Sequence, residues 1–162
     1  GLLMSAPLWE NRILGHQFAT PMAKGMWVNK TAAAEDSKRV VEEFDVRTPG
    51  VNVLASALSG GNQQKVAVGR WVGCEPNVFL LDEPTRGVDV GAKAEIHALL
   101  DRLARGGAAV IAASSEMEEL LAVSDRVVVM HEGRISGELE RDEFTEEAIM
   151  ELATGRSLMN AS

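Results

Sequence analysis

Residues 77–85 read NVFLLDEPT, an apolar run that ends in two carboxylates, a proline and a threonine. The run follows Pro76 and predicts a buried strand over 77–81. In an open α/β sheet, ligands bind at the carboxyl ends of the strands, which is where Asp82 and Glu83 stand. Adjacent carboxylates repel each other unless a cation lies between them. A phosphate-bound Mg²⁺ held by one of the two carboxylates would be such a cation. For the acidic pair alone, a solvated loop is the simpler interpretation.

Helices and strands alternate on the carboxyl-terminal side of this strand. The spacing of apolar residues and the positions of glycines predict helices over 91–105, 116–123 and 146–154, and strands over 108–112, 126–130 and 134–139. Uninterrupted apolar strands separated by helices indicate a parallel sheet covered on both faces, so the expected fold class is α/β. Residues 1–57 have a mainly helical pattern, with the most regular helix over 31–44.

Composition excludes several functions. The 162 residues include 16 Lys and Arg against 24 Asp and Glu, a formal net charge of −8, which argues against binding to nucleic acid. The single cysteine, Cys74, makes no internal disulfide and fits a reducing compartment. The longest apolar runs, at 78–81 and 108–113, are far shorter than the roughly 20 residues of a membrane-spanning helix. If the protein acts at a membrane, another chain must cross it.

A second motif, LSGGNQQK at residues 58–65, precedes the acidic pair by about twenty residues. Ser59, Gly60 and Gly61 stand at the start of a helix predicted to reach about residue 73. The start of a helix offers unpaired N–H groups and the positive end of its dipole, and glycines let a phosphate approach the backbone. Alone, Ser-Gly-Gly is usually a flexible turn, but its combination with the strand that ends in DEPT is highly specific.

Together these motifs resemble the ATP-binding subunits of ABC transporters. LSGGNQQKV at 58–66 is similar to the signature motif, VFLLDEPT at 78–85 to the Walker B strand, and TRGVD at 85–89 to the D-loop. The NQQK extension and TRGVDVGAK at 85–93 resemble importers of simple sugars and nucleosides. In such ATPases one chain usually carries two nucleotide-binding halves, and this sequence is most similar to the second half.

The resemblance implies a fold as well. The implied fold is a partial P-loop NTPase core with parallel strands, joined to an α-helical subdomain. The opening residues 1–17 also resemble that subdomain of the family. The expected segments are a helical signature subdomain over 1–75, the carboxyl-terminal part of the core sheet over 76–140, and a helix and tail over 141–162. Trp9 and Trp27 are expected to fill the small helical core, as is Trp71; the alternative is that they cap a groove for a partner.

The resemblance also implies roles for individual residues. Asp82 would help to hold Mg²⁺, and Glu83 would orient or deprotonate the water that attacks ATP. Ser59 would contact the γ-phosphate of a nucleotide held by the opposite half, and Asp89 would link the two sites. The full set expected at the nucleotide is Ser59, Gly60, Gly61, Asn62, Gln63, Asp89 and Ser115.

Two departures from the family pattern bear on activity. None of the fifteen glycines is followed by lysine, so the chain has no P-loop. The segment that would carry the Q-loop is missing as well, so we expect the chain to begin just after the Q-loop and not to bind ATP tightly alone. Ser115 occupies the position of the switch histidine, and serine can hydrogen-bond a phosphate oxygen but cannot carry a positive charge. By this interpretation residues 59–61 serve the intact P-loop of the other half and matter more to turnover than Glu83.

The implied partners are membrane permease subunits, the other nucleotide-binding half and, indirectly, a solute-binding protein, at the cytoplasmic face of the plasma membrane. One hypothesis is therefore that the chain is part of an importer ATPase that takes up a simple sugar or nucleoside. The alternative is a catalytically incomplete fragment that serves only as a binding module for a membrane subunit or a partner ATPase half. An ABC-type ATPase that acts on DNA or ribosomes is disfavoured by the acidic charge and the NQQK extension.

Overall fold

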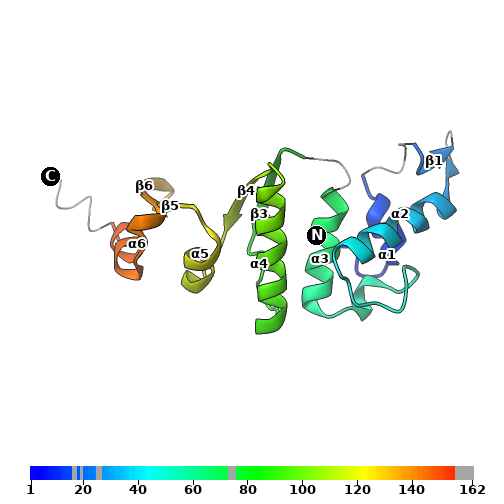
Figure 1. The fold of residues 1–162 in the computed structure, drawn as a ribbon, viewed down its shortest axis with the longest axis horizontal. Helices are drawn as coiled ribbons and strands as arrows, with labels where there is room; N and C mark the ends of the chain where they lie inside the picture. The colour runs from blue at the N-terminus through cyan, green and yellow to red at the C-terminus, as the bar shows by residue number, and fades with distance from the viewer. Residues whose placement is uncertain (16–17, 19, 25–26, 73–75, 156–162) are drawn as a thin grey trace. The chain divides into compact units, whose positions relative to one another are not determined.

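The computed structural model describes residues 1–15, 18, 20–24, 27–72 and 76–155 (Figure 1). The chain forms two compact units, residues 1–112 and 113–162, which are described separately below. The segment boundaries expected after residues 75 and 140 remain predictions. Within the described ranges, no helix is both long enough and apolar enough to cross a membrane.

Three helices form the amino-terminal part of the first unit: α1 (Leu8–Ile13), α2 (Lys30–Glu43) and α3 (Gly60–Val72). The single-turn 3₁₀ helix η1 (Ala55–Ala57) precedes α3. Asn29 caps α2 because its side chain accepts a hydrogen bond from the backbone N–H of Ala32. The helices enclose an apolar core of Leu8, Val40, Phe44, Val46, Ala55, Leu58, Val66 and Val68, to which Leu99 from the next helix adds. The mainly helical pattern predicted for this region is confirmed.

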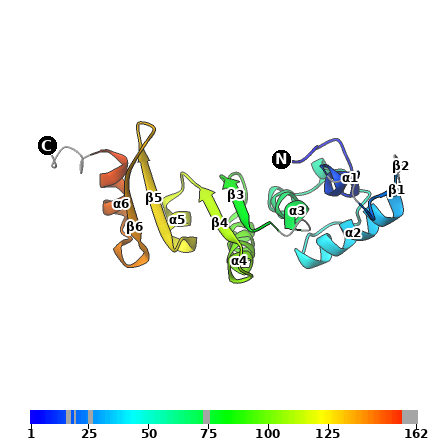
Figure 2. The same cartoon turned by 90° about the horizontal axis from the view of Figure 1, so that it is seen from above.

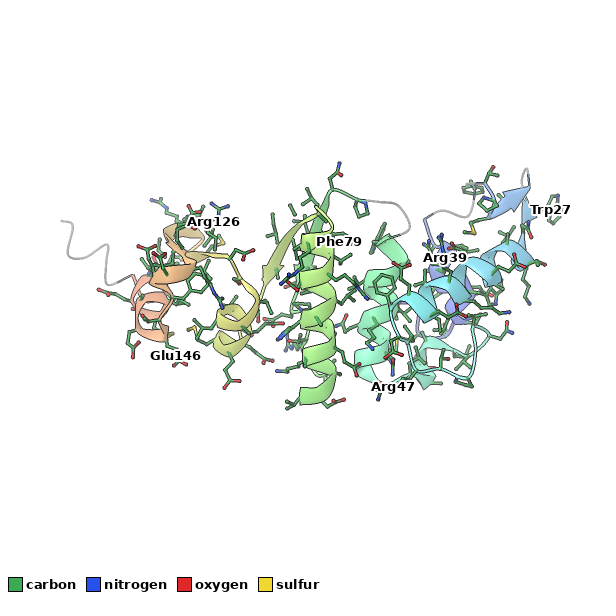
Figure 3. All side chains as sticks on the ribbon, in the orientation of Figure 1. Trp27, Arg39, Arg47, Phe79, Arg126 and Glu146 are labelled. Atoms are coloured by element: carbon green, nitrogen blue, oxygen red, sulfur yellow. The ribbon has the colours of Figure 1, made fainter. Side chains whose placement is uncertain are left out.

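A small hairpin interrupts the helical region, which the sequence pattern did not indicate. Strand β1 (Ala23–Lys24) pairs antiparallel with β2 (Trp27–Val28). Trp27 lies on this two-residue strand, is 82% exposed and points away from the hairpin (Figure 3). Trp71, near the end of α3, is also exposed and stacks with Arg70. The prediction that both tryptophans fill the helical core is wrong, because the side chains of both are exposed.

The first unit also contains a strand–helix–strand element. Strand β3 (Val78–Asp82) pairs with β4 (Ala109–Ala113), and α4 (Val90–Arg105) connects them and lies beside the pair (Figures 1 and 2). The strands are parallel, as the helical crossover requires, and the α/β class is confirmed. Helix α4 buries the apolar face predicted from its spacing, with Ile96, Leu99 and Leu100 each at most 4% exposed.

One face of this strand pair lies open. Phe79 is buried, but Leu80 is 75% exposed, and Val78 and Ile111 are exposed as well. Since successive side chains of a strand point to opposite faces, only one side of the pair is covered by the described elements. Within the described residues of this unit one face of the pair is covered, and the expected covering of the other face stays a prediction.

The second unit consists of α5 (Met117–Val123), β5 (Arg126–His131), β6 (Arg134–Glu140), the 3₁₀ turn η2 (Arg141–Glu143) and α6 (Glu146–Ala153). Strands β5 and β6 form an antiparallel hairpin around the turn at Glu132 and Gly133, and α6 packs against it (Figure 2). Its core is Val127, Val129 and Ile149. The described strands thus form three two-stranded sheets, of which the β5–β6 hairpin is the third. A two-residue turn with positive φ at both positions favours that local pairing.

Candidate functional site

The loop before α3 presents Ser59 at the surface. Leu58 is buried in the helical core and anchors one side of the loop, while Ser59 is exposed. The carbonyl of Ser59 accepts a hydrogen bond from the N–H of Gln63 at 2.9 Å, so the helix starts at this residue. The hydroxyl of Ser59 therefore lies beside the amino-terminal end of a 13-residue helix, where the dipole favours an anion.

The two amide side chains that follow bond to the protein. Asn62 donates from Nδ2 to Oγ of Ser59 at 2.9 Å, and its Oδ1 accepts from the backbone N–H of Arg47 at 2.8 Å. Gln63 donates from Nε2 to the carbonyls of Ala55 and Leu58, at 3.2 and 3.0 Å. Both amides therefore fix the shape of the loop that carries Ser59.

The two glycines of the loop lie at a close approach between two segments. A Cβ on Gly61 would stand 2.4 Å from the Cβ of Ala92, in the first turn of α4. A Cβ on Gly60 would stand 3.3 Å from the carbonyl oxygen of Gly87. The start of α3 is therefore packed directly against residues 87–92. Gly61 is buried in this contact and Gly60 is exposed, so only Gly60 keeps an open face toward a ligand.

The acidic pair stands at the end of β3, at the position that the sequence predicted. Asp82 is exposed and is the last residue of the strand, and Glu83 is half-buried with a φ of 48°. A non-glycine residue in this left-handed region carries strain of about 1–2 kcal/mol, and such strain is found most often at functional sites. The turn is closed by a hydrogen bond from the N–H of Arg86 to the carbonyl of Glu83, and Thr85 is 1% exposed.

Asp89 connects this turn to α4. Its Oδ1 accepts a hydrogen bond from the N–H of Ala92 at 2.9 Å, so Asp89 is the N-cap of the helix and is itself exposed. Because Ala92 also lies against Gly61, Asp89 and the loop that carries Ser59 belong to one local surface. Ser115 is exposed and belongs to the second unit, in the segment between β4 and α5.

Sequence reasoning missed an ion-pair cluster behind this surface. Lys65 on α3 is only 5% exposed, and its Nζ lies 2.7 Å from Oε2 of Glu95 on α4. Lys65 also donates to the carbonyl of Asp45 at 2.9 Å, and Arg47 donates to Oε1 of Glu95 at 3.0 Å. The hydrogen bond and charge of Lys65, aided by Arg47, lower the pKa of Glu95. No local sequence signal indicates this pairing, because lysine is usually exposed and Glu95 lies thirty residues further along the chain.

Among the residues that the structure describes, no group of three or more His, Cys, Asp and Glu side chains converges as a metal site would. A protein carboxylate can still hold Mg²⁺ when substrate phosphates and water supply the remaining ligands. The exposed carboxylate of Asp82 at a strand end fits that kind of site.

The chain is similar to known proteins along most of its length. The family model described as ABC transporter matches residues 4–86. A protein of Geobacillus kaustophilus, provisionally named a ribose/galactose/methyl galactoside import ATP-binding protein, is 52% identical over 133 residues, which are 82% of this chain and 26% of that protein. The ribose import ATP-binding protein RbsA of Bacillus subtilis is 46% identical over 155 residues, which are 96% of this chain and 31% of that protein.

Solved structures agree on the fold. The ATP-binding cassette MJ0796, in a dimeric post-hydrolysis state bound to ADP and Pi, matches with a TM-score of 0.71 and 21% identity. The match covers 89% of this chain and 60% of the cassette. The chain spans between about a quarter and a third of the length of the curated relatives it matches.

Proposed function

Because the chain belongs to the ABC transporter family, we propose that it is part of an importer ATPase that couples ATP binding and hydrolysis to the uptake of a simple sugar or nucleoside. The relatives named for ribose import favour a sugar. The observation that carries the proposal is the packing of Ser59, Gly60 and Gly61 against residues 87–92, which brings the signature motif and the D-loop onto one surface. The interaction-module alternative is not favoured, since the relatives are named as ATP-binding proteins.

In this proposal the surface at the start of α3 receives the γ-phosphate of ATP. Ser59 donates from its hydroxyl, and Gly60 offers an open backbone at the positive end of the helix. Gly61, Asn62 and Gln63 hold the loop in shape through the contacts described above. Asp89 lies on the same surface and faces the partner half.

The acidic turn is proposed to serve the other composite site, which is distinct from the one that contains Ser59. Asp82 would hold Mg²⁺ together with the phosphates, and the metal would neutralise the negative charge that develops on them. Glu83 orients or deprotonates the attacking water from a turn in which its own backbone is strained, with a φ of 48°. Ser115 is proposed to hydrogen-bond a phosphate oxygen, in place of a histidine.

The proposal requires partners. No glycine of the sequence precedes a lysine, so the P-loop that cradles the phosphates is supplied by residues other than these 162. We assign the remaining parts to a second nucleotide-binding half, membrane permease subunits and, indirectly, a solute-binding protein. The chain would then act at the cytoplasmic face of the plasma membrane.

Two substitutions in the assembled transporter test the proposal. Ser59→Ala removes a donor to the phosphate and is expected to lower the rate of ATP hydrolysis by roughly 10²-fold. Glu83→Gln is expected to lower it less, because the composite site that contains Ser59 is proposed to carry most of the turnover. Sugar uptake measured in parallel should follow hydrolysis. If only Glu83→Gln abolishes hydrolysis, the assignment of the active site is wrong; if neither variant changes it, the proposed function fails.

A further inference from the structure

Asn62 stands between the proposed phosphate contact and the rest of the protein. We propose that Asn62 is a positioning residue that sets the direction of the Ser59 hydroxyl, so that its proton is available to a phosphate oxygen. The inference rests on the proposed function, because it takes Ser59 as the group that meets the phosphate. It assigns to Asn62 an action through Ser59 and no contact with the nucleotide.

The orientation of the Asn62 amide follows from its partner on Arg47. A backbone N–H can only donate, so the atom of Asn62 that lies 2.8 Å from the N–H of Arg47 must be the acceptor Oδ1. The NH₂ group of the same amide then faces Oγ of Ser59 at 2.9 Å. An amide nitrogen has no acceptor capacity, so Ser59 must accept in this bond.

A serine hydroxyl has one proton and two lone pairs. Because Asn62 occupies a lone pair of Ser59, the proton of the hydroxyl points elsewhere, and Ser59 is exposed. A phosphate oxygen is an acceptor and requires a donor. A neutral donor to an ionised acceptor forms the stronger, charge-assisted kind of hydrogen bond. The amide therefore prepares Ser59 to donate before any phosphate arrives.

The peptide that orients Asn62 is itself held on two sides. The side chain of Arg47 bonds to Glu95 at 3.0 Å, and Glu95 bonds to the buried Lys65 at 2.7 Å. Lys65 also donates to the carbonyl of Asp45, two residues before Arg47. The backbone around Arg47 is thus tied to both α3 and α4. Rotating the amide of Asn62 by 180° would lose the hydrogen bond with Arg47, because NH₂ would then face N–H. Oδ1 would then face Oγ of Ser59 and could accept a hydrogen bond only if the serine turned its proton inward.

Asn62→Asp is the sharpest perturbation because it keeps the size of the side chain. A carboxylate can still accept from the N–H of Arg47, but toward Ser59 it offers only an acceptor, so the serine proton turns inward. In the assembled transporter we expect ATP hydrolysis to fall roughly tenfold to a hundredfold. Gln64→Glu is the matched control, since it adds the same charge in the same helical turn without altering this pair, and we expect a change of less than about threefold.

A double-mutant cycle tests whether Asn62 acts through Ser59. In the Ser59→Ala background, Asn62→Asp is expected to have little further effect on hydrolysis. If Ser59→Ala lowers hydrolysis and Asn62→Asp lowers it by the same factor in both backgrounds, the inference is overturned while the proposed function stands. If Ser59→Ala leaves hydrolysis unchanged, the role proposed for Ser59 falls and the inference falls with it.

A second measurement needs no nucleotide. In the chain labelled with ¹⁵N-asparagine, the side-chain amide of Asn62 should give a distinct NMR signal with slow exchange of the proton that faces Ser59. Ser59→Ala should shift that signal and speed its exchange, whereas the signal of the exposed Asn52 should stay unchanged. If Ser59→Ala leaves the chemical shift and the exchange rate of the Asn62 amide unchanged, the inference is overturned.

Discussion

Replacing Gly61 with alanine would add a methyl group where α3 and α4 meet. The new Cβ would stand 2.4 Å from the Cβ of Ala92, whereas packed carbon atoms lie about 3.5–4.0 Å apart. The two helix starts would have to separate by about 1 Å. Overpacking of this kind costs about 1–3 kcal/mol, and the better helix propensity of alanine returns up to about 1 kcal/mol. We expect a net loss of about 1–2 kcal/mol, because the obstacle is the first atom of a side chain and cannot rotate away.

The matched variant removes the obstacle. In the double variant Gly61→Ala with Ala92→Gly, the nearest remaining atom is the Cα of residue 92 at 3.6 Å, an ordinary contact. Thermal unfolding followed by circular dichroism should show Gly61→Ala lowering the Tm by roughly 2–8 °C. The double variant should be about as stable as Ala92→Gly alone. If the double variant instead loses as much stability as the two single variants added together, the close approach of α3 and α4 is refuted.

Two further predictions concern helix α4. Asp89→Ala should cost about 1 kcal/mol of unfolding free energy, because the N–H of Ala92 loses its cap, while Asp89→Asn should cost less in the same urea titration. Glu95 should make stability depend on pH: its pKa is lowered below its ordinary value of 4.5 in the folded chain, so its contribution is present above that value and is lost as the pH falls through the folded pKa. Urea unfolding between pH 6 and pH 3 should therefore show a shallower loss for Glu95→Gln than for the wild type, and parallel curves would contradict the Lys65 pairing.

The elements of regular structure were predictable because their signals are local. The spacing of Ile96, Leu99 and Leu100 describes one face of α4, and that face is buried. The glycine at the turn before β6 marks the hairpin, and Asp89 and Thr145 stand where helix caps belong. Each of these features depends on residues within a turn or two of the chain.

The features that the sequence did not reveal depend on tertiary contacts. Lysine is usually exposed, so nothing local indicates that Lys65 is buried beside Glu95, thirty residues away. Gly61 was expected to let a phosphate approach, but its contact with Ala92 gives it a packing role that only the arrangement of α3 and α4 shows.

Photolabelling with ATP that carries a reactive group on its γ-phosphate tests the central claim most directly. In the assembled transporter, ATP is proposed to bind with its γ-phosphate against the start of α3. The label should therefore be recovered on the peptide that contains Ser59 and Gly60, and Asn62→Asp should reduce its yield. Labelling that reaches other parts of the transporter but leaves residues 58–63 unmodified would contradict the claim.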